Sequence, residues 1–216
     1  MKKDEIIEEL VSRFPELGTA AGDIQKAYET LSDRFAAGGK LLCAGNGGSC
    51  ADAGHIVGEL MKGFELPRPL TEEQTLSLTR AHARGRAVAA HLQRSLPALA
   101  LTAGGSFGTA FANDVESGAE YVFAQQVFAL GRKGDVFLGI STSGNSANVL
   151  NAAVAAKAVG MTTIGLTGRS GGELAGLSDI CIKVPADGSR TVQEYHLPVY
   201  HTLCIMLERR FFGGEG

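Results

Sequence analysis

The sequence predicts a doubly wound α/β domain in which helices flank both faces of a five-stranded parallel sheet. Five short apolar runs of β-type residues alternate along the chain with segments of helical periodicity, which is the pattern of parallel strands covered by helices. The chain has 216 residues, of which 44% are hydrophobic, and a chain of this length buries roughly 70% of its unfolded surface. We therefore expect a single domain over residues 1–216.

The predicted elements follow one another in a regular order. A hairpin of two helices, 3–14 and 18–37, comes first, with Pro15 between them and apolar residues at helical spacing in both. The predicted strands are 40–44, 97–103, 136–141, 162–167 and 180–184. Helices are expected at 50–62, 119–130, 146–159, 172–177 and 191–212.

Residues 66–96 interrupt this alternation. The segment contains five arginines but only two acids, Glu72 and Glu73. Thr71 followed by these acids is typical of the start of a helix, so we expect this Arg-rich insertion to be helical in part. Two interpretations stay open: a solvated helix whose arginine stems cover apolar neighbours, or a cationic lid or subunit contact near an anionic ligand.

Charge and cysteine content limit the possible partners. The 20 basic and 23 acidic residues give a net charge of −3, which argues against a broadly basic nucleic-acid surface. No apolar stretch approaches the roughly 20 residues that cross a bilayer, and acids occupy the N-terminus where a signal peptide would be apolar. The cysteines lack metal-type spacing, so free thiols are expected. We expect a cytoplasmic protein without nucleic-acid or membrane partners.

Two loops that join a predicted strand to a predicted helix are suited to a phosphorylated ligand. The first is GNGGS at 45–49, whose glycines permit close backbone approach, although a tight turn would use the same residues. The second, STSGNS at 141–146, places four hydroxyl groups beside the N–H groups of a helix start. An N-cap would need only one hydroxyl. We therefore expect a phosphate at the second loop.

Titratable side chains follow the first loop and recur in the last helix. His55 and Glu59 are four residues apart on a predicted helix, so they share one face. The residues around them are small and apolar, which argues against an exposed ion pair. Gln193 and His201 lie in the final helix. A single histidine is more often structural than functional, so each of these residues is weak evidence when taken alone.

Together these segments resemble the sugar-isomerase (SIS) domain and, within it, the sedoheptulose 7-phosphate isomerase (phosphoheptose isomerase) family. The similar segments are GNGGS, DAGHIVGEL, ANDV, GISTSGNSANVL, IGLTG and VQEYHLPVYH, and the resemblance extends from about residue 20 to 212, apart from 66–96. The resemblance implies isomerisation of sedoheptulose 7-phosphate to D-glycero-D-manno-heptose 7-phosphate, the first step of nucleotide-heptose biosynthesis. It also implies a homotetramer with active sites between subunits.

The resemblance further assigns roles to individual residues. Glu59 and His201 would be the acid–base pair, with Glu59 as the base. One zinc ion per subunit would be bound by His55, Glu59, Gln193 and His201. The phosphate would be held by Ser141, Thr142, Ser143 and Ser146. The sugar would be lined by Asn46, Gly47, Gly48 and Ser49, by Asn113 and Asp114 from the ANDV loop, and by His55, Glu59 and Gln193.

Helix geometry limits the zinc site. Gln193 and His201 are eight residues apart, which corresponds to about 12 Å of rise within one helix. A single ion could bind both only if Gln193 precedes the regular helix, or if a second chain supplies a ligand. The zinc site therefore depends on where the last helix begins.

Two other functions stay open. One is a non-catalytic SIS-domain protein that binds a sugar phosphate or associates with the replication initiator, although that relative lacks the counterparts of Glu59 and His201. The other is an isomerase of another phosphorylated ketose. Two departures bear on this choice. Lys62 precedes Gly63 where the family places glycine before the basic residue, which leaves a substrate contact by Lys62 in doubt, and the longer segment 66–96 could reshape the mouth of the site.

Overall fold

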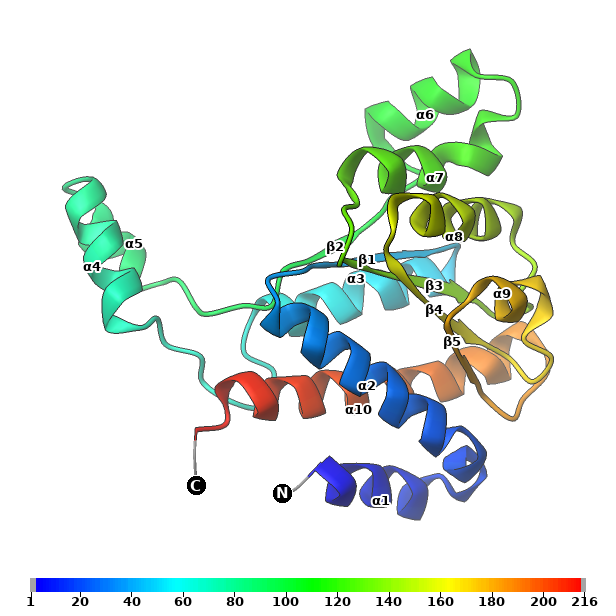
Figure 1. Cartoon of the computed structure of the whole chain (residues 1–216), viewed down its shortest axis with the longest axis horizontal. Coiled ribbons are helices and arrows are strands. Elements are labelled where there is room, and N and C mark those ends of the chain that lie inside the picture. Colours follow the sequence, from blue (N-terminus) through cyan, green and yellow to red (C-terminus); the bar gives the residue numbers. More distant parts are fainter. Residues whose placement is uncertain (1–2, 215–216) are drawn as a thin grey trace.

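The computed structural model describes residues 3–214 and contains one five-stranded parallel sheet with helices on both faces (Figure 1). The strand order is β2-β1-β3-β4-β5, and every neighbouring pair is parallel. The strands are β1 (Leu41–Gly45), β2 (Ala98–Ala100), β3 (Val136–Ser141), β4 (Thr162–Thr167) and β5 (Ile180–Lys183). The predicted fold class is confirmed.

The helices occupy most of the chain between the strands. Within residues 3–214 they are α1 (Lys3–Arg13), α2 (Ala21–Ala36), α3 (Gly48–Met61), α4 (Glu72–Ala81), α5 (Gly85–Ala89), α6 (Gly105–Asp114), α7 (Gly118–Leu130), α8 (Ala147–Val159), α9 (Gly172–Leu177) and α10 (Ser189–Phe212). A 3-10 helix (Pro15–Ala20) joins α1 to α2, so the N-terminal hairpin turns at the proline. No helix in this described part of the chain is long and apolar enough to cross a membrane.

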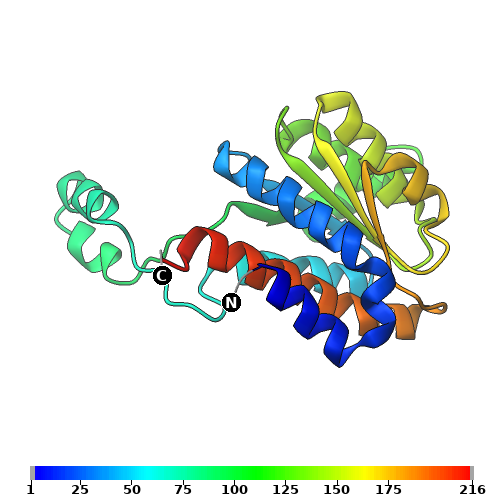
Figure 2. The same ribbon diagram turned by 60° about the horizontal axis from the view of Figure 1, so that its bottom comes forward.

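Each face of the sheet has its own hydrophobic core. On one face, α2, α3 and α10 cover strand residues such as Cys43 and Leu138. On the other face, α7, α8 and α9 cover the intervening residues, such as Leu42 and Phe137 (Figure 1). Successive side chains of a strand point to opposite faces, so the continuous apolar runs of the sequence fill both cores. Figure 2 shows α1 packed alongside α10, outside the first of these layers.

The helices α3 and α10 run in the same direction, side by side. At their starts, Gln193 packs on Gly48. Further along both helices, the Tyr200 hydroxyl lies 3.0 Å from His55 Nδ1. Residues of α3 and α10 at equal heights therefore face each other, and this alignment brings the titratable residues of the two helices together.

Residues 69–93 form an arm that projects from the body of the molecule (Figures 1 and 2). An antiparallel bridge between Pro69 and Gln93 closes the base of the arm, and α4 and α5 pack on each other within it. Helix α4 begins at the expected cap, because Thr71 and Gln74 exchange hydrogen bonds between side chain and backbone at 3.0 and 3.2 Å. The Arg-rich insertion is thus two short helices on a narrow stalk.

The arm buries little of its apolar surface. None of the residues of α4, all of which the structure describes, is buried. Leu76, Val88 and Leu92 are 45%, 41% and 50% exposed. Apolar side chains left open on a projecting hairpin favour contact with another molecule over a purely solvated helix.

Two elements differ from the sequence-based expectation. The ANDV residues Asn113 and Asp114, expected in a loop, form the end of α6. Two glycines lower the helix propensity of this segment, but Phe107 and Phe111 stack one turn apart with ring centroids 5.5 Å apart. The predicted strand 97–103 is regular only over Ala98–Ala100, because it lies at the edge of the sheet and pairs with β1 alone.

Candidate active site

The loops after β1 and β3 meet at the carboxyl edge of the sheet. These strands are neighbours, although β2 lies between them in the sequence, so the winding of the chain reverses at this point. Doubly wound sheets bind ligands at such a point, where helix N-termini converge. The amides of Asn46, in the loop after β1, and Asn148, in the first turn of α8, form reciprocal hydrogen bonds of 2.8 and 2.9 Å. Asn148 lies within the SIS-like segment, but no spacing rule singles it out.

Close packing shapes the loop after β1. Gly47 has φ +54°, a conformation that favours glycine. A Cβ atom on Gly48 would lie 2.6 Å from Gln193 Nε2, so any larger residue there would displace the Gln193 side chain. Ser49 is buried beneath the loop. The backbone of the predicted sugar-binding loop is therefore held in one conformation, with Gln193 against it.

The loop after β3 brings the predicted phosphate-binding hydroxyls together. Ser141 Oγ and Ser146 Oγ are 3.0 Å apart, and Thr142 Oγ1 lies 3.2 Å from Ser189 Oγ at the start of α10. Ser143 Oγ accepts a backbone N–H of the loop at 3.1 Å. These groups surround the N-terminus of α8, whose partial positive charge favours an anion. Ser189 joins this cluster only through the fold, because it is 47 residues away in the sequence from Thr142.

The start of helix α9 packs against the same loop. Gly144 has φ +70°, and a Cβ atom there would lie 2.0 Å from the carbonyl oxygen of Gly171. The backbone N–H of Leu174 donates to the Gly144 carbonyl at 2.9 Å. The only residue that fits at position 144 is therefore glycine, and the hydroxyl groups on either side of it are held in place.

Glu59, His55 and His201 meet between α3 and α10. His55 Nε2 lies 3.1 Å from Glu59 Oε1, and the rings of His55 and His201 are edge to face with centroids 4.9 Å apart. Glu59 is 7% exposed, whereas the His55 side chain is 42% exposed. His55 thus contacts both members of the predicted acid–base pair. Because its side chain is partly exposed, solvent reaches the pair on this side.

Tyr200 and Asp52 fix the orientation of His55. The Tyr200 hydroxyl lies 3.0 Å from His55 Nδ1 and 3.3 Å from Asp52 Oδ1. Burial, followed by the nearby Asp52 carboxylate, raises the pKa of Tyr200, so its hydroxyl stays protonated. Burial also raises the pKa of Asp52, against the opposing effects of Tyr200 and His55. Sequence reasoning missed both residues, since only the packing of α10 on α3 connects them to the site.

His201 lies in surroundings that keep its ring neutral near pH 7. Burial is the main cause that lowers the pKa of His201, His55 adds to this effect, and Glu59 opposes it. Within the described residues, the buried Nε2 of His201 has no hydrogen-bond partner. A buried polar atom without a partner costs free energy, so this nitrogen is suited to bind a substrate atom, a proton or a metal ion.

Lys62 contacts the second carboxylate oxygen of Glu59. Its Nζ atom lies 3.0 Å from Glu59 Oε2 and 6.0 Å from the centroid of the Phe64 ring. The Lys62 side chain is 58% exposed, so the ion pair is open to water. In this chain Lys62 precedes Gly63, whereas the family places glycine before the basic residue. The exchanged order still places a basic group beside Glu59, the predicted base.

The four predicted zinc ligands do not come together within one chain. Gln193 and His201 both lie inside α10, separated by about 12 Å of helical rise. Gln193 packs on Gly48, whereas His201 contacts His55. In the part of the chain that the structure describes, no three His, Cys, Asp or Glu side chains are arranged to hold a metal. A shared ion therefore requires a ligand from a second chain.

The predicted sugar-binding loop and the predicted base lie at opposite ends of α3. Glu59 is eleven residues beyond Gly48, which corresponds to about 16 Å of rise. The start and the end of α3 therefore form two separate halves of the candidate site.

Asn113 and Asp114 lie apart from both halves of the site. They end α6, on the outer side of α7 and away from α3 and α10 (Figure 1). Asn113 Nδ2 donates to Asp114 Oδ1 at 2.8 Å, and both side chains are exposed. Among the residues that the structure describes, no hydrogen bond or ion pair joins them to either loop. Their predicted contact with the sugar also requires a second copy.

Known proteins resemble this chain over nearly its whole length. A family model of the SIS domain matches residues 82–168. The phosphoheptose isomerase of Akkermansia muciniphila is 37% identical over 205 residues, which cover 95% of this chain and 94% of that protein. The chain belongs to the phosphoheptose isomerase family. The family member of Geotalea daltonii is 43% identical, over 88% of this chain and 85% of its own.

The fold is shared with a solved phosphoheptose isomerase. The structure of the enzyme from Francisella tularensis superimposes with a TM-score of 0.72 at 31% sequence identity. The superposition covers 95% of this chain and 97% of that one. Membership of the phosphoheptose isomerase family therefore applies to the body as a whole and not only to the serine-rich loop.

Proposed function

We propose that the chain is an aldose–ketose isomerase that converts sedoheptulose 7-phosphate to D-glycero-D-manno-heptose 7-phosphate, the first step of nucleotide-heptose biosynthesis. The names of its relatives support the substrate, and the observation that carries the chemistry is the buried Glu59 carboxylate beside His55 and His201. All four cysteines are free thiols, which supports a place in the reducing cytoplasm.

Proton transfer by Glu59 and His201 accounts for the reaction. Glu59 removes a proton from C1 of the ketose, and the neutral His201 ring donates a proton to the oxygen on C2, which gives an enediol. Glu59 then returns a proton to C2 while His201 recovers one from the C1 hydroxyl, which leaves an aldehyde at C1. Both residues end in their starting protonation states. General acid–base catalysis of this kind contributes about 10²- to 10⁴-fold.

His55 and Lys62 hold the Glu59 carboxylate for this step. Each contacts a different carboxylate oxygen, at 3.1 and 3.0 Å. With both oxygens fixed, the plane of the carboxylate is set relative to the substrate, which is the kind of orientation that lowers the barrier to proton transfer. The ammonium group of Lys62 also supplies positive charge near the oxygens that become negative in the transition state.

The loop at 141–146 supplies the phosphate site in this proposal. Its hydroxyl groups and the N-terminus of α8 offer donors to a dianion without any lysine. The hydrogen bond between Ser141 and Ser146 shows that two of these hydroxyls are already close enough to bind one small anion.

We further propose a zinc ion that is bound between two copies of the chain, with His55, Glu59, Gln193 and His201 as its ligands, because no three His, Cys, Asp or Glu side chains of the described residues of one copy are arranged to hold a metal. The partnerless Nε2 of His201 supports this, as does a donor set of imidazole, carboxylate and amide oxygen, which suits zinc. When bound, zinc would polarise the oxygens on C1 and C2. The proton transfers described above are those of Glu59 and His201 without a bound ion.

We also propose a homotetramer with the active sites between subunits. The separation of Gln193 from His201 by about 12 Å of helical rise supports a site that is completed by a neighbouring copy. Exposed apolar residues support an interface: Phe128 on α7 is 68% exposed and Val154 on α8 is 53% exposed. The arm at 69–93 provides a second candidate contact.

An isomerase assay on sedoheptulose 7-phosphate, with the aldose product followed by NMR, tests the proposed function. We expect turnover that falls after chelation and returns when zinc is added. Turnover that is unchanged by chelation would rule out an essential zinc ion that a chelator can remove. The assignment of the acid–base pair would stand. Turnover only with another phosphorylated ketose would change the substrate. Absence of turnover with a panel of phosphorylated ketoses would favour the non-catalytic SIS-domain protein.

A further inference from the structure

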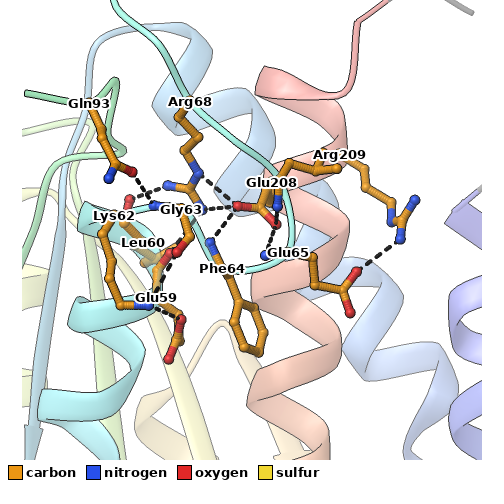
Figure 3. A network of polar contacts seen from close by, with 11 residues as sticks. Glu59, Leu60, Lys62, Gly63, Phe64, Glu65, Arg68, Gln93, Glu208 and Arg209 are labelled. Carbon is orange, nitrogen blue, oxygen red and sulfur yellow. Dashed lines mark hydrogen bonds and ion pairs between the residues drawn. The ribbon is translucent and has the colours of Figure 1, made fainter. Parts of the chain in front are cut away.

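A buried ion pair lies just beyond the acid–base pair, and the reaction described above does not use it. Arg68 and Glu208 have fully buried side chains, and Arg68 Nη2 lies 2.8 Å from Glu208 Oε1 (Figure 3). Arg68 Nε donates to the same oxygen, also at 2.8 Å. Arg68 is one of the five arginines of segment 66–96, but it neither covers apolar surface as a solvated stem nor reaches an anionic ligand. It points into the body of the molecule.

The remaining hydrogen-bonding groups of the pair bind backbone. Arg68 donates to the carbonyl oxygens of Leu60 at 2.7 Å and Glu59 at 2.9 Å. The guanidinium also packs on the Phe212 ring, 4.5 Å from its centroid. The carbonyls at the end of a helix carry partial negative charge, so a cation is favoured there. Arg68 therefore caps the last turn of α3, the turn that carries Glu59.

Glu208 holds the loop that follows α3. Its two carboxylate oxygens accept the backbone N–H groups of Phe64, Glu65 and Leu66 at 2.8, 2.8 and 3.1 Å (Figure 3). Burial acts to raise the pKa of Glu208, but the hydrogen bonds from Phe64 and Glu65 and the charge of Arg68 outweigh it, so the pKa lies below its usual value. The carboxylate is thus charged and fully paired.

The pair connects the two helices that supply the acid–base pair. Glu59 is on α3, whose last turn is bound by Arg68. His201 is on α10, two turns before Glu208 on the same helix. No residue of the pair contacts Glu59 or His201 through their side chains in any described hydrogen bond or ion pair. Its effect on them is through the position of the helices.

We propose that Arg68 and Glu208 are positioning residues that set the distance between Glu59 and His201, and so the geometry of proton transfer. The inference rests on the proposed function, because it gives the pair a role in that reaction. A misplacement of about 1 Å in a catalytic group can cost about 100-fold in rate. A rigid connection between α3 and α10 at this level protects against such a displacement.

Stability alone is a poor explanation for this ion pair. Removing two charges from water costs much of what their attraction returns, and apolar residues of similar volume often serve stability as well. Apolar residues could not bind the carbonyls of α3 and the N–H groups of the following loop at the same time. What the charged pair adds is therefore a fixed geometry.

The chain offers a matched control in the turns that precede β1 and β3. Asp135, which is 5% exposed, pairs with Lys40 and accepts the backbone N–H groups of Lys40 and Arg132, both at 2.9 Å. These residues precede β1 and β3, far from the carboxyl edge of the sheet. Asp135→Asn removes a paired, buried carboxylate without touching α3 or α10.

The experiment compares Arg68→Lys, Glu208→Gln and Asp135→Asn in the full-length protein, assayed well below the melting temperature of each variant. Lysine keeps the charge but cannot bind Glu208 and two carbonyls together. We expect kcat on sedoheptulose 7-phosphate to fall about 10- to 100-fold for the first two variants. Their KM should stay within about threefold of the wild-type value, because the phosphate site is distant. Asp135→Asn should lower the melting temperature and keep kcat within about twofold.

A second readout does not depend on turnover. In protein labelled with ¹⁵N-histidine, the imidazole signals of His55 and His201 should shift in Arg68→Lys and Glu208→Gln and stay in place in Asp135→Asn. If one of the first two variants does not fold, Phe212→Leu gives a milder test, because it removes the ring on which the guanidinium groups of Arg68 and Arg94 pack and leaves the ion pair in place. We expect smaller shifts of the same histidine signals, and unchanged signals would contradict the positioning role.

The outcomes separate the two proposals. If Arg68→Lys and Glu208→Gln lose stability but keep kcat and the histidine signals, as the control does, the positioning role is wrong. If the wild-type protein has no isomerase activity while the histidine signals move as expected, the proposed reaction fails but the pair still sets the geometry of the histidines.

Discussion

The two ends of α3 hold their functional residues in different ways. At its start, the loops at 46–49 and 141–146 combine local turns, glycines and neighbouring hydroxyls with contacts from distant residues such as Asn148 and Gln193. At its end, Glu59 is held by residues distant in the sequence, because Arg68 and Glu208 are 140 residues apart and His55 meets Tyr200 across 145. The residue types of the first end therefore form a local motif that distant contacts support, whereas the partners of the second end come together only once α10 has packed on α3. Substitutions at the two ends should differ accordingly in whether they change binding or turnover.

Replacing the base should have the largest effect. Glu59→Gln keeps the size of the side chain and removes its ability to take a proton, so we expect kcat to fall at least about 100-fold with KM little changed. The measurement is steady-state kinetics on sedoheptulose 7-phosphate. Glu65→Gln, a nearby exposed carboxylate that pairs with Arg209, is the control and should leave the rate unchanged. A near-normal rate in Glu59→Gln would remove Glu59 from the role of base.

A change at the other end should affect binding. Ser143→Ala removes one hydroxyl from the predicted phosphate site, and a hydrogen bond to a charged group contributes about 1.5–3 kcal/mol. We expect KM for the phosphorylated sugar to rise about tenfold or more, with kcat close to the wild-type value. Ser12→Ala, an exposed serine on α1, serves as the control. An unchanged KM would place the phosphate elsewhere.

Removal of the arm should have a smaller effect on rate and a clear effect on assembly. Replacing residues 70–92 with a short Gly-Ser linker keeps the bridge at Pro69 and Gln93 and removes the exposed Leu76 and Val88. We expect a smaller oligomer by light scattering and a several-fold loss of activity that reflects dissociation. Unchanged size and activity would mean that the arm is a solvated insertion without a partner.

The smallest effect is expected from a change of pH. It acts on His196, a buried histidine of α10 that lies between Gln193 and His201. Burial lowers the pKa of His196 to about 4, from about 6.5 in an unfolded chain. Below pH 6.5 the unfolded state therefore binds a proton that the folded state does not, so stability falls with falling pH until about pH 4. From pH 7 to pH 5.5 the loss should be about 1 kcal/mol, measured by urea unfolding. The free energy of unfolding of His196→Leu should fall less over this pH range than that of the wild-type protein. An identical pH dependence of the two proteins would contradict the assignment of this loss to His196.

The sequence predicts what depends on neighbouring residues and misses what depends on packing. The alternation of strands and helices and the four hydroxyls at 141–146 are local patterns, so the fold class and the clustering of the phosphate loop follow from them. The i,i+4 spacing likewise places His55 beside Glu59. Tyr200 and Glu208 look like ordinary residues of an amphipathic helix, and only the parallel alignment of α10 with α3 gives them partners. The glycines of α6 conceal a helix that tertiary contacts stabilise.

The narrow base of the arm has a consequence for how this chain can change. The two strands of the stalk meet at Pro69 and Gln93, and Arg94 N donates to the Arg68 carbonyl at 2.8 Å, so the chain leaves and re-enters the body at nearly one point. A segment with adjacent ends can be lengthened, shortened or exchanged without moving the elements on either side of it. The position between Pro69 and Gln93 is accordingly a natural insertion point, where a tag or an entire binding module could be introduced while the body folds as before.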